Sequence, residues 1–393
     1  MKVLLIIGTR PEAIKLAPVY FELQKRNIPV KICATFQHST LLQEVFDIFG
    51  ITPDYNLDVM KAGQDISYLT QVVLDRTKAV FEQEKPTLVL VQGDTTTAFA
   101  SALSAYYLKI PVGHVEAGLR TNDIYSPFPE ELNRQAISLF AEYNFAPTDL
   151  AVKALMRAGI LGEVIHNTGN TIVDSLQLMK KKIAQGSVSV TEKVAQLVQE
   201  CGRSGQKKIL LTVHRRESFN GGINHILRAV KEYALENPDV FVFYPYHPNP
   251  HVLKAIEEVG LSEVENIYLT KPLAYSDLVY LLLNIDLVIT DSGGIQEEAV
   301  SLGKTVLVAR EKTERMEGVQ AGIAHLVGTD TQKIKQALKD HIHVQQHKET
   351  QIYGNGDAAE KIVIIIERKW MHDEKSLCRR TGVHRTANSD NSC

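Results

Sequence analysis

Three carboxylate residues occupy positions in the sequence from which they could take part in acid–base chemistry. Asp94 and Glu116 each follow a short β-branched apolar run, and Glu130 follows the proline turn Pro127–Pro129. Each has an ordinary alternative, because Asp caps helices and acidic residues favour a first helical turn. Gathered at one site, however, carboxylates raise one another's pKa values, which provides a general acid and a general base near neutral pH. The pattern therefore predicts an acid–base site in the first half of the chain.

A phosphate-binding turn is predicted in the second half. Ser292-Gly293-Gly294 lies between an apolar run and a helical segment, so several backbone N–H groups there can bind a diphosphate at the helix N-terminus. Glu298 follows within the first turns of that helix, where an acid can accept hydrogen bonds from ribose hydroxyls. Arg315 offers a further cation after the next apolar run.

Three more basic residues follow apolar runs and suit an anionic ligand. Arg10 and Lys15 lie in and after a Gly-Thr-Arg-Pro-Glu turn that opens a helix, where they add charge beside free N–H groups. That turn lacks the GxGxxG pattern of dinucleotide-binding proteins. His214 directly follows a strand-like run and precedes two arginines, which suits contact with a phosphate or a developing anion. The alternative for His214 is a structural histidine at the end of a sheet.

The elements that must position these residues alternate between strand and helix. Apolar runs of four or five residues fit strands that are covered on both faces, and amphipathic segments such as 12–25 and 223–236 separate them. The expected strands are Val3–Ile7, Val30–Ala34, Leu88–Val91, Val112–Val115, Ile209–Val213, Val240–Tyr244, Leu287–Thr290 and Thr305–Val308. This alternation predicts an α/β protein with two Rossmann-like domains that face each other across a cleft.

The domain boundaries follow from composition. We expect a first domain over residues 1–169, a second over 170–356, and a C-terminal helix over 357–369. Residues 370–393 are polar and rich in Ser and Asn at the end, so we expect a disordered tail.

Composition restricts the partners and the compartment. The 393 residues include 43 basic and 46 acidic side chains, a near balance that disfavours a broad nucleic-acid-binding surface. Four cysteines without a CxxC pair indicate neither a disulfide framework nor a zinc ribbon, and they fit a reducing cytoplasm. The longest apolar stretch, Leu278–Ile289, is too short to span a bilayer. We therefore expect a soluble, cytoplasmic protein without a membrane partner.

Six motifs, in order and spacing, resemble the bacterial, non-hydrolysing UDP-N-acetylglucosamine 2-epimerase family over roughly residues 1–369. They are Gly8-Thr9-Arg10-Pro11-Glu12, Gly93-Asp94-Thr95-Thr96-Thr97, the segment Val112 to Arg120, Pro129-Glu130-Glu131, His214-Arg215-Arg216-Glu217 and the segment Asp291 to Glu298. The resemblance implies a glycosyltransferase B-type fold, a UDP-binding second domain, a C-terminal helix that crosses back to the first domain, and no metal or redox cofactor. It also implies a homodimer that supplies precursors for surface polysaccharide.

The resemblance also assigns roles by motif position. Asp94, Glu116 and Glu130 match the family's acid and base groups, and His214 matches its contact on the diphosphate side. The implied UDP ligands are Arg10, Ser292, Gly293, Gly294, Glu298 and Arg315, with Lys15 beside them. In activated members a second UDP-sugar binds as an allosteric effector, for which Gln37, Gln64, Arg215 and His247 are the candidates here.

The implied reaction interconverts UDP-GlcNAc and UDP-ManNAc. The proton on sugar C2 is not next to a carbonyl, so its removal is expected to accompany expulsion of UDP from C1, which gives a 2-acetamidoglucal. Two alternatives remain open at this point. A hydrolysing relative would add water and release UDP and N-acetylmannosamine, and a glycosyltransferase or nucleotide-sugar sensor would use the same fold for another purpose.

Overall fold

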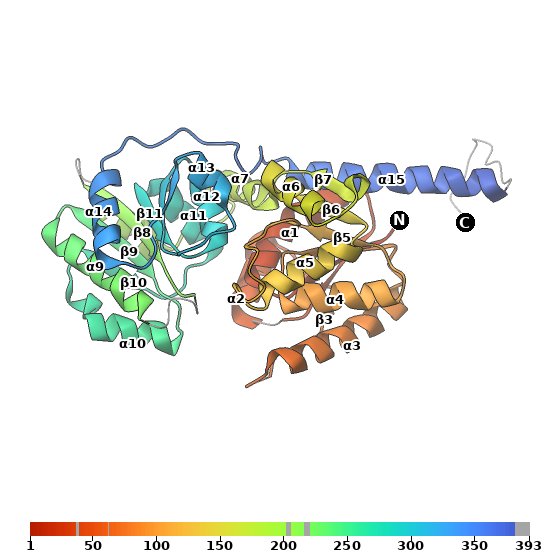
Figure 1. The fold of residues 1–393 in the computed structure, drawn as a ribbon, viewed down its shortest axis with the longest axis horizontal. Helices are drawn as coiled ribbons and strands as arrows, with labels where there is room; N and C mark the ends of the chain where they lie inside the picture. The colour runs from red at the N-terminus through yellow and green to blue at the C-terminus, as the bar shows by residue number, and fades with distance from the viewer. Residues whose placement is uncertain (37–38, 62, 202–205, 216–220, 382–393) are drawn as a thin grey trace.

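The computed structural model describes residues 1–36, 39–61, 63–201, 206–215 and 221–381, which form two α/β units and a long C-terminal helix (Figure 1). The first unit, here called the first domain, is built on a parallel seven-stranded sheet of order β3-β2-β1-β4-β5-β6-β7. Its strands are β1 (Val3–Ile7), β2 (Val30–Ala34), β3 (Tyr55–Asn56), β4 (Leu88–Gln92), β5 (Val112–Val115), β6 (Tyr143–Ala146) and β7 (Ile165–Asn167). Its helices are α1 (Arg10–Lys25), α2 (Ser39–Phe49), α3 (Ile66–Glu84), α4 (Thr96–Tyr107), α5 (Glu130–Phe140) and α6 (Asp149–Arg157).

The second domain repeats this plan around a parallel six-stranded sheet of order β10-β9-β8-β11-β12-β13. Its strands are β8 (Lys207–Thr212), β9 (Val240–Pro245), β10 (Ile267–Thr270), β11 (Leu287–Thr290), β12 (Thr305–Val308) and β13 (Ala324–Leu326). Its helices are α8 (Glu192–Glu200), α9 (Gly222–Glu236), α10 (Pro250–Val259), α11 (Tyr275–Asn284), α12 (Gly293–Ser301), α13 (Met316–Gln320) and α14 (Thr331–His341). Both orders place the first strand of the unit beside the fourth, which is the doubly wound Rossmann arrangement.

Both faces of each sheet are buried, which explains the continuous apolar runs. In β1, Val3, Leu5 and Ile7 belong to one hydrophobic core, whereas Leu4 and Ile6 belong to another on the opposite face. The second sheet divides its residues in the same way, and one of its cores is continuous with that of the first domain. Strands buried on both faces have no polar side to show, so the sequence signal is a run rather than an alternation. The prediction of an α/β protein with two Rossmann-like units is confirmed.

The chain crosses between the domains twice, at neighbouring places. The Asn170 backbone N–H donates to the Tyr353 carbonyl at 2.7 Å. A Cβ on Gly169 would lie 3.2 Å from the Cα of Gly354, and both glycines have positive φ, so the two crossings pass close together. After the first crossing, α7 (Thr171–Ala184) packs against α1 of the first domain and against α11 and α12 of the second.

The C-terminal helix α15 (Ala358–Thr381) runs back over the first domain although it follows the second in sequence (Figure 1). It packs on α1 and α7 and buries Ile362, Val363 and Ile366. Asp174 of α7 accepts hydrogen bonds from the first N–H groups of this helix.

The expected end of this helix at residue 369 is wrong, and so is the expected disorder of residues 370–381. The helix continues to Thr381, and residues 382–393 of the expected tail lie outside the described residues. No glycine or proline occurs between Gly356 and Gly382, so nothing in the backbone chemistry ends the helix earlier. The polar composition of residues 370–381 is therefore compatible with helical structure.

Within the described residues no helix combines the length and the apolar character needed to cross a membrane.

Candidate active site

Asp94 lies in the turn between β4 and α4, and its carboxylate does not cap the helix that follows. The cap of α4 is Thr95, whose hydroxyl accepts from the Ala98 N–H at 3.0 Å. The Asp94 carboxylate pairs instead with the guanidinium of Arg134 in α5, at 2.6 Å between Oδ2 and Nη2. The ordinary alternative of a helix cap is therefore wrong, and Asp94 is left available for chemistry.

Glu116 follows β5 in a left-handed backbone conformation, with φ of 67°. Its carboxylate contacts the Lys15 ammonium, accepts from Gln92 Nε2 at 2.8 Å, and accepts from Arg315 Nη2 of the second domain at 3.1 Å. Glu116 thus makes one of the contacts between the first and second domains at this site.

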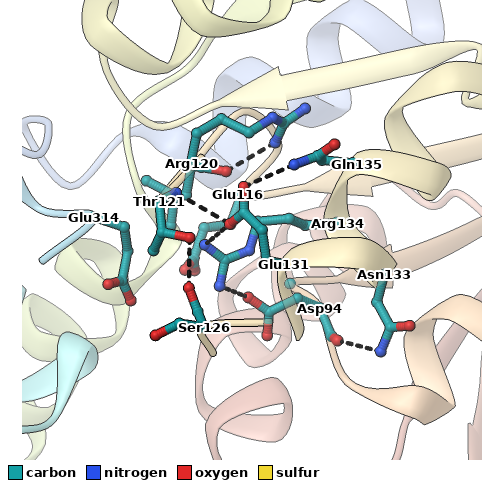
Figure 2. Close-up of polar contacts among 12 residues, drawn as sticks. Asp94, Glu116, Arg120, Thr121, Ser126, Glu131, Asn133, Arg134, Gln135 and Glu314 are labelled. Carbon is teal, nitrogen blue, oxygen red and sulfur yellow. Dashed lines mark hydrogen bonds and ion pairs between the residues drawn. The ribbon is translucent and has the colours of Figure 1, made fainter. Parts of the chain in front are cut away.

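Glu130 and Glu131 begin α5 but have different environments. Glu131 is fully buried and its carboxylate accepts from the Thr121 N–H at 3.1 Å and from Gln135 Nε2 at 2.8 Å, so it is occupied by internal contacts (Figure 2). Glu130 is half-buried, and burial together with the charge of Asp94 raises its pKa. Of this acidic pair, only Glu130 has a carboxylate suited to exchange protons with a ligand.

Arg315 connects the second-domain turn to the carboxylates of the first domain. Its guanidinium is buried and pairs with Glu297 at 3.0 Å, with Glu314, and with Glu116. Lys15 of the first domain lies 3.6 Å from Glu297 as well. Burial lowers the pKa of the Lys15 ammonium, but the Glu116 and Glu297 carboxylates outweigh that effect and raise it. Lys15 and Arg315 therefore both stay charged beside Glu116.

The predicted phosphate-binding turn forms the N-terminus of α12, with Ser292 at the cap position and Gly293 as the first helical residue. A Cβ on Gly293 would lie 2.4 Å from the Arg315 guanidinium carbon, so a glycine is needed for Arg315 to lie across the turn. Around Gly294, in contrast, no described protein atom lies within 4 Å of the Cβ position. The Gly294 face of the turn is therefore open to a ligand.

Glu298 lies in α12 and is buried against α11. It accepts a hydrogen bond from the Tyr275 hydroxyl at 2.8 Å. Burial raises the pKa of Glu298 to about 7, and the charges of Lys15, Glu297 and Arg10 also act on it. Arg10, the first residue of α1, is in turn influenced by Glu298, and burial lowers its pKa. The predicted ligands Arg10 and Glu298 thus influence each other's charged state although they belong to different domains.

His214 lies after β8 and is tied to the turn before α12. The backbone N–H groups of His214 and Arg215 both donate to Asp291 Oδ2 at 2.7 Å, and His214 Nδ1 lies 3.6 Å from Asp291 Oδ1. The imidazole of His214 stacks on that of His247, with ring centroids 5.5 Å apart. Asp291 therefore couples the His214 loop to the predicted phosphate-binding turn.

The residues predicted for an effector site do not all lie together in the structure. His247 stacks on His214, and the charge of Arg215 acts on both Glu130 and Glu314. Gln64 precedes α3 and accepts from the Lys61 N–H at 3.0 Å. Gln37 lies outside the described residues.

Several residues of the site were not found from the sequence. Glu297 and Glu314 flank Arg315, Gln92 and Asn133 bond to Glu116 and to the Asp94 backbone, and Arg134 pairs with Asp94. Glu314 adjoins its partner Arg315 in sequence, which was a signal that could have found it. The partners of the other four are distant in sequence, so only the folded arrangement reveals them. Among the described residues no group of three or more His, Cys, Asp or Glu side chains is arranged to hold a metal ion.

The two doubly wound domains, joined by a crossing C-terminal helix, define a fold of the glycosyltransferase B type. A family model described as UDP-N-acetylglucosamine 2-epimerase matches residues 22–367, and the chain belongs to this family. The chain is 43% identical over 369 residues to the UDP-N-acetylglucosamine 2-epimerase of Salmonella typhimurium, covering 92% of this chain and 97% of that protein. It is 44% identical over 372 residues to the enzyme of Campylobacter jejuni, covering 93% and 97%.

Solved structures agree with this assignment. The crystal structure of UDP-GlcNAc 2-epimerase from Neisseria meningitidis bound to UDP-GlcNAc superimposes with a TM-score of 0.87 at 41% identity, covering 94% of this chain and 100% of that one. The Methanocaldococcus jannaschii enzyme in complex with UDP-GlcNAc and UDP gives a TM-score of 0.82 at 34% identity, covering 94% and 100%.

Proposed function

We propose that the chain interconverts UDP-GlcNAc and UDP-ManNAc as an isomerase. The observation that carries the proposal is the pairing of Glu116 of the first domain with Arg315 of the second, whose guanidinium lies across the α12 turn. The charge of Asp94 acts on Arg315 and on Glu130, which supports a common site for the three carboxylates. Relatives that match nearly the full length are UDP-N-acetylglucosamine 2-epimerases, and one is bound to UDP-GlcNAc. A glycosyltransferase on this fold would need the turn but not the three carboxylates together.

The proposed chemistry begins with loss of UDP from sugar C1. The C1–O bond breaks, its electron pair leaves with the diphosphate, and a carboxylate takes the C2 proton, so that a C1=C2 double bond forms. This 2-acetamidoglucal avoids a free carbanion at C2. Inversion is completed when a proton is delivered to the other face of C2 and UDP returns to C1. The sequence of steps needs neither a redox cofactor nor a metal.

The carboxylates divide this work by their surroundings. Burial and the charge of Asp94 raise the pKa of Glu130 and so favour its protonated form, and we therefore assign Glu130 the role of proton donor. Asp94 pairs with Arg134, and Glu116 lies between Lys15 and Arg315. Three carboxylates on one sugar would supply the proton acceptor and the proton donor that inversion requires on opposite faces.

The second domain would hold the leaving UDP. The open Gly294 face of the α12 turn presents backbone N–H groups and the positive end of a helix, which stabilise a departing diphosphate. His214 is held to the same turn through Asp291, so its imidazole would lie on the diphosphate side. Arg10 and Glu298 would contribute from the contact between the domains, Glu298 towards the ribose.

An equilibrium experiment tests the proposal. Starting from pure UDP-GlcNAc and, separately, from pure UDP-ManNAc, the enzyme should bring both solutions to the same ratio of the two UDP-sugars, followed by NMR. Release of UDP with free N-acetylmannosamine from either start would instead identify a hydrolysing enzyme. Binding of the UDP-sugars without conversion would leave a nucleotide-sugar sensor as the better description.

We also propose a homodimer. Tyr106, Tyr107 and Leu139 at the ends of α4 and α5 are between 53% and 70% exposed, an apolar group that a second copy would cover. The Tyr106 ring packs on Phe140 with centroids 5.2 Å apart, so this surface is continuous across the two helices. Light scattering of the wild type and of Leu139→Glu should give dimer and monomer masses, and a monomeric wild type would refute the proposal.

The effector and pathway assignments are further proposals. Arg215 and His247 lie beside His214, so a second UDP-sugar bound by them would act directly on the acid–base residues. Activation of the epimerisation rate by UDP-GlcNAc, lost in His247→Ala, is the expected result, whereas simple saturation kinetics in both proteins would contradict it. A cytoplasmic location and a role in surface-polysaccharide precursor synthesis remain predictions from the sequence.

A further inference from the structure

We propose that Arg134 and Asn133 of α5 are positioning residues that fix the Asp94 carboxylate relative to Glu130. The inference rests on the proposed function, because it assigns the two carboxylates to the same epimerisation. It concerns two side chains that do not need to touch the substrate.

Consecutive residues of α5 hold Asp94 at two points. Arg134 Nη2 lies 2.6 Å from Asp94 Oδ2, and Asn133 Nδ2 donates to the Asp94 backbone carbonyl at 2.9 Å (Figure 2). One contact fixes the carboxylate and the other fixes the backbone, so Asp94 cannot rotate or shift without breaking one of them. Gly93 with positive φ and the Thr95 cap hold the turn on either side.

The guanidinium that holds Asp94 is buried and pairs with a second carboxylate. The Arg134 side chain is 4% exposed, and its Nη1 lies 3.2 Å from Glu131 Oε2, whose side chain is fully buried. Glu131 is in turn held by the backbone N–H of Thr121 and by Gln135 (Figure 2). Arg134 therefore pairs with the carboxylates of both Asp94 and Glu131, of which only Asp94 is partly exposed.

The same helix carries Glu130, four residues before Arg134. Side chains four apart in a helix are neighbours on one face, so the distance between Glu130 and the Arg134 guanidinium is set by α5 itself. Since Arg134 also pairs with Asp94, the helix determines the relative position of the Asp94 and Glu130 carboxylates. The charge of Asp94 acts on Glu130, which places the two groups near one another.

Substitutions of Arg134 and Asn133 can separate the effect of the positive charge from the effect of holding Asp94 in position. Arg134→Lys keeps the positive charge but loses the planar group that reaches Asp94 and Glu131 together. Arg134→Met removes both. Asn133→Ala removes only the hold on the Asp94 backbone. Arg157→Met is the matched control, because Arg157 is an exposed arginine in the last turn of α6.

The expected result is a fall in kcat without a fall in affinity. A displacement of about 1 Å at a reacting group costs roughly 100-fold in rate, so Arg134→Lys should lower kcat by about that factor. Asn133→Ala should lower it by about tenfold, while KM for UDP-GlcNAc and Kd for UDP stay within about threefold. Arg157→Met should match the wild type. Thermal unfolding of each variant identifies any that fails to fold, and Asn133→Ala remains informative if Arg134 is not replaceable.

A double substitution tests whether Arg134 acts through Asp94. In the Asp94→Asn background, with the slow exchange of the C2 proton followed over long times, Arg134→Lys should reduce the rate by less than about twofold further. The pH profile adds a second readout. The charge of Arg134 lowers the pKa of Glu130, so Arg134→Met should move the Glu130 limb to higher pH, whereas Arg134→Lys should leave it in place.

Three outcomes would overturn the inference. An equal loss in both backgrounds would show that Arg134 acts independently of Asp94. A large rise in KM with unchanged kcat would make Arg134 a substrate ligand, and wild-type kcat in Arg134→Lys and Asn133→Ala would show that neither contact matters. Failure of the proposed function is distinguishable, because the wild type and Arg157→Met would then form no UDP-ManNAc, and the inference would fall with it.

Discussion

The buried carboxyl group of Glu12 gives a prediction whose size follows from its surroundings. Glu12 lies in the first turn of α1 and is 1% exposed. Its Oε2 accepts from the Gly8 N–H at 2.5 Å and the Thr9 N–H at 2.8 Å, and its Oε1 accepts from the Thr95 hydroxyl. It therefore joins the turn that carries Arg10 to the turn that carries Asp94.

Burial determines how Glu12 titrates. Burial raises the pKa of Glu12 from 4.5 to about 7, although the hydrogen bonds from Thr95, Gly8 and Thr9 each lower it. A carboxyl whose pKa is higher in the folded state binds a proton there that the unfolded state releases. Its stabilising contribution is thus fully present below pH 4.5 and is lost as the pH rises through 7. At 1.36 kcal/mol per pH unit, the loss amounts to about 3 kcal/mol.

Glu12→Gln removes the titration while preserving the contacts. The amide oxygen can accept from the two backbone N–H groups, and the amide nitrogen can donate to the Thr95 hydroxyl. The free energy of unfolding of the variant, minus that of the wild type, should therefore rise by about 2–3 kcal/mol between pH 5 and pH 8. The comparison isolates Glu12, because other buried acids such as Glu298 titrate in both proteins.

Urea unfolding followed by circular dichroism at pH 5, 6, 7 and 8 measures this difference. Glu163→Gln provides the control, since Glu163 is exposed in the short 3-10 turn Gly162–Val164, and its difference from the wild type should be flat. A Glu12→Gln difference that stays constant across this range would refute the reasoning that burial dominates at Glu12. A difference that falls with pH would show that the hydrogen bonds outweigh burial.

Two further substitutions test the second-domain side of the site. Gly294→Ala adds a methyl group where no protein atom lies within 4 Å, so the melting temperature should stay near that of the wild type while UDP affinity, measured by calorimetry, falls at least about tenfold. Unchanged affinity would place the diphosphate elsewhere. Arg315→Met leaves Glu116, Glu297 and Glu314 without their shared buried cation and should destabilise the protein by about 3–5 kcal/mol in urea unfolding. A loss below about 1 kcal/mol would contradict the role given to these ion pairs.

The strands were predictable where the burial is two-sided and apolar. The runs Val3–Ile7, Val112–Val115 and Leu287–Thr290 are strands with the predicted bounds, because every residue in them is buried. Strands near the sheet edges were missed. β6 contains Asn144 and β13 contains His325, so neither has the continuous apolar run that the prediction used.

The site, like the strands, was only partly predictable from the sequence. Motif residues at strand ends could be proposed from the sequence, since the carboxyl ends of parallel strands meet at one edge of a sheet. Their pairings could not, because Glu116 and Arg315 are 199 residues apart and no local pattern links them. The stacking of His214 on His247 likewise joins two residues that the sequence assigned to separate sites. The helix end at residue 369 was misjudged because polarity was taken as a sign of disorder.

The central claim is that the carboxylates of the first domain exchange the C2 proton while UDP stays available for return to C1. The most direct test is to incubate the enzyme with UDP-GlcNAc in deuterated water and to follow C2 of both UDP-sugars by NMR. The account predicts deuterium at C2 in intact UDP-ManNAc and UDP-GlcNAc, with exchange greatly slowed in Asp94→Asn while UDP binding is retained. Formation of UDP-ManNAc that keeps the original C2 proton would contradict it.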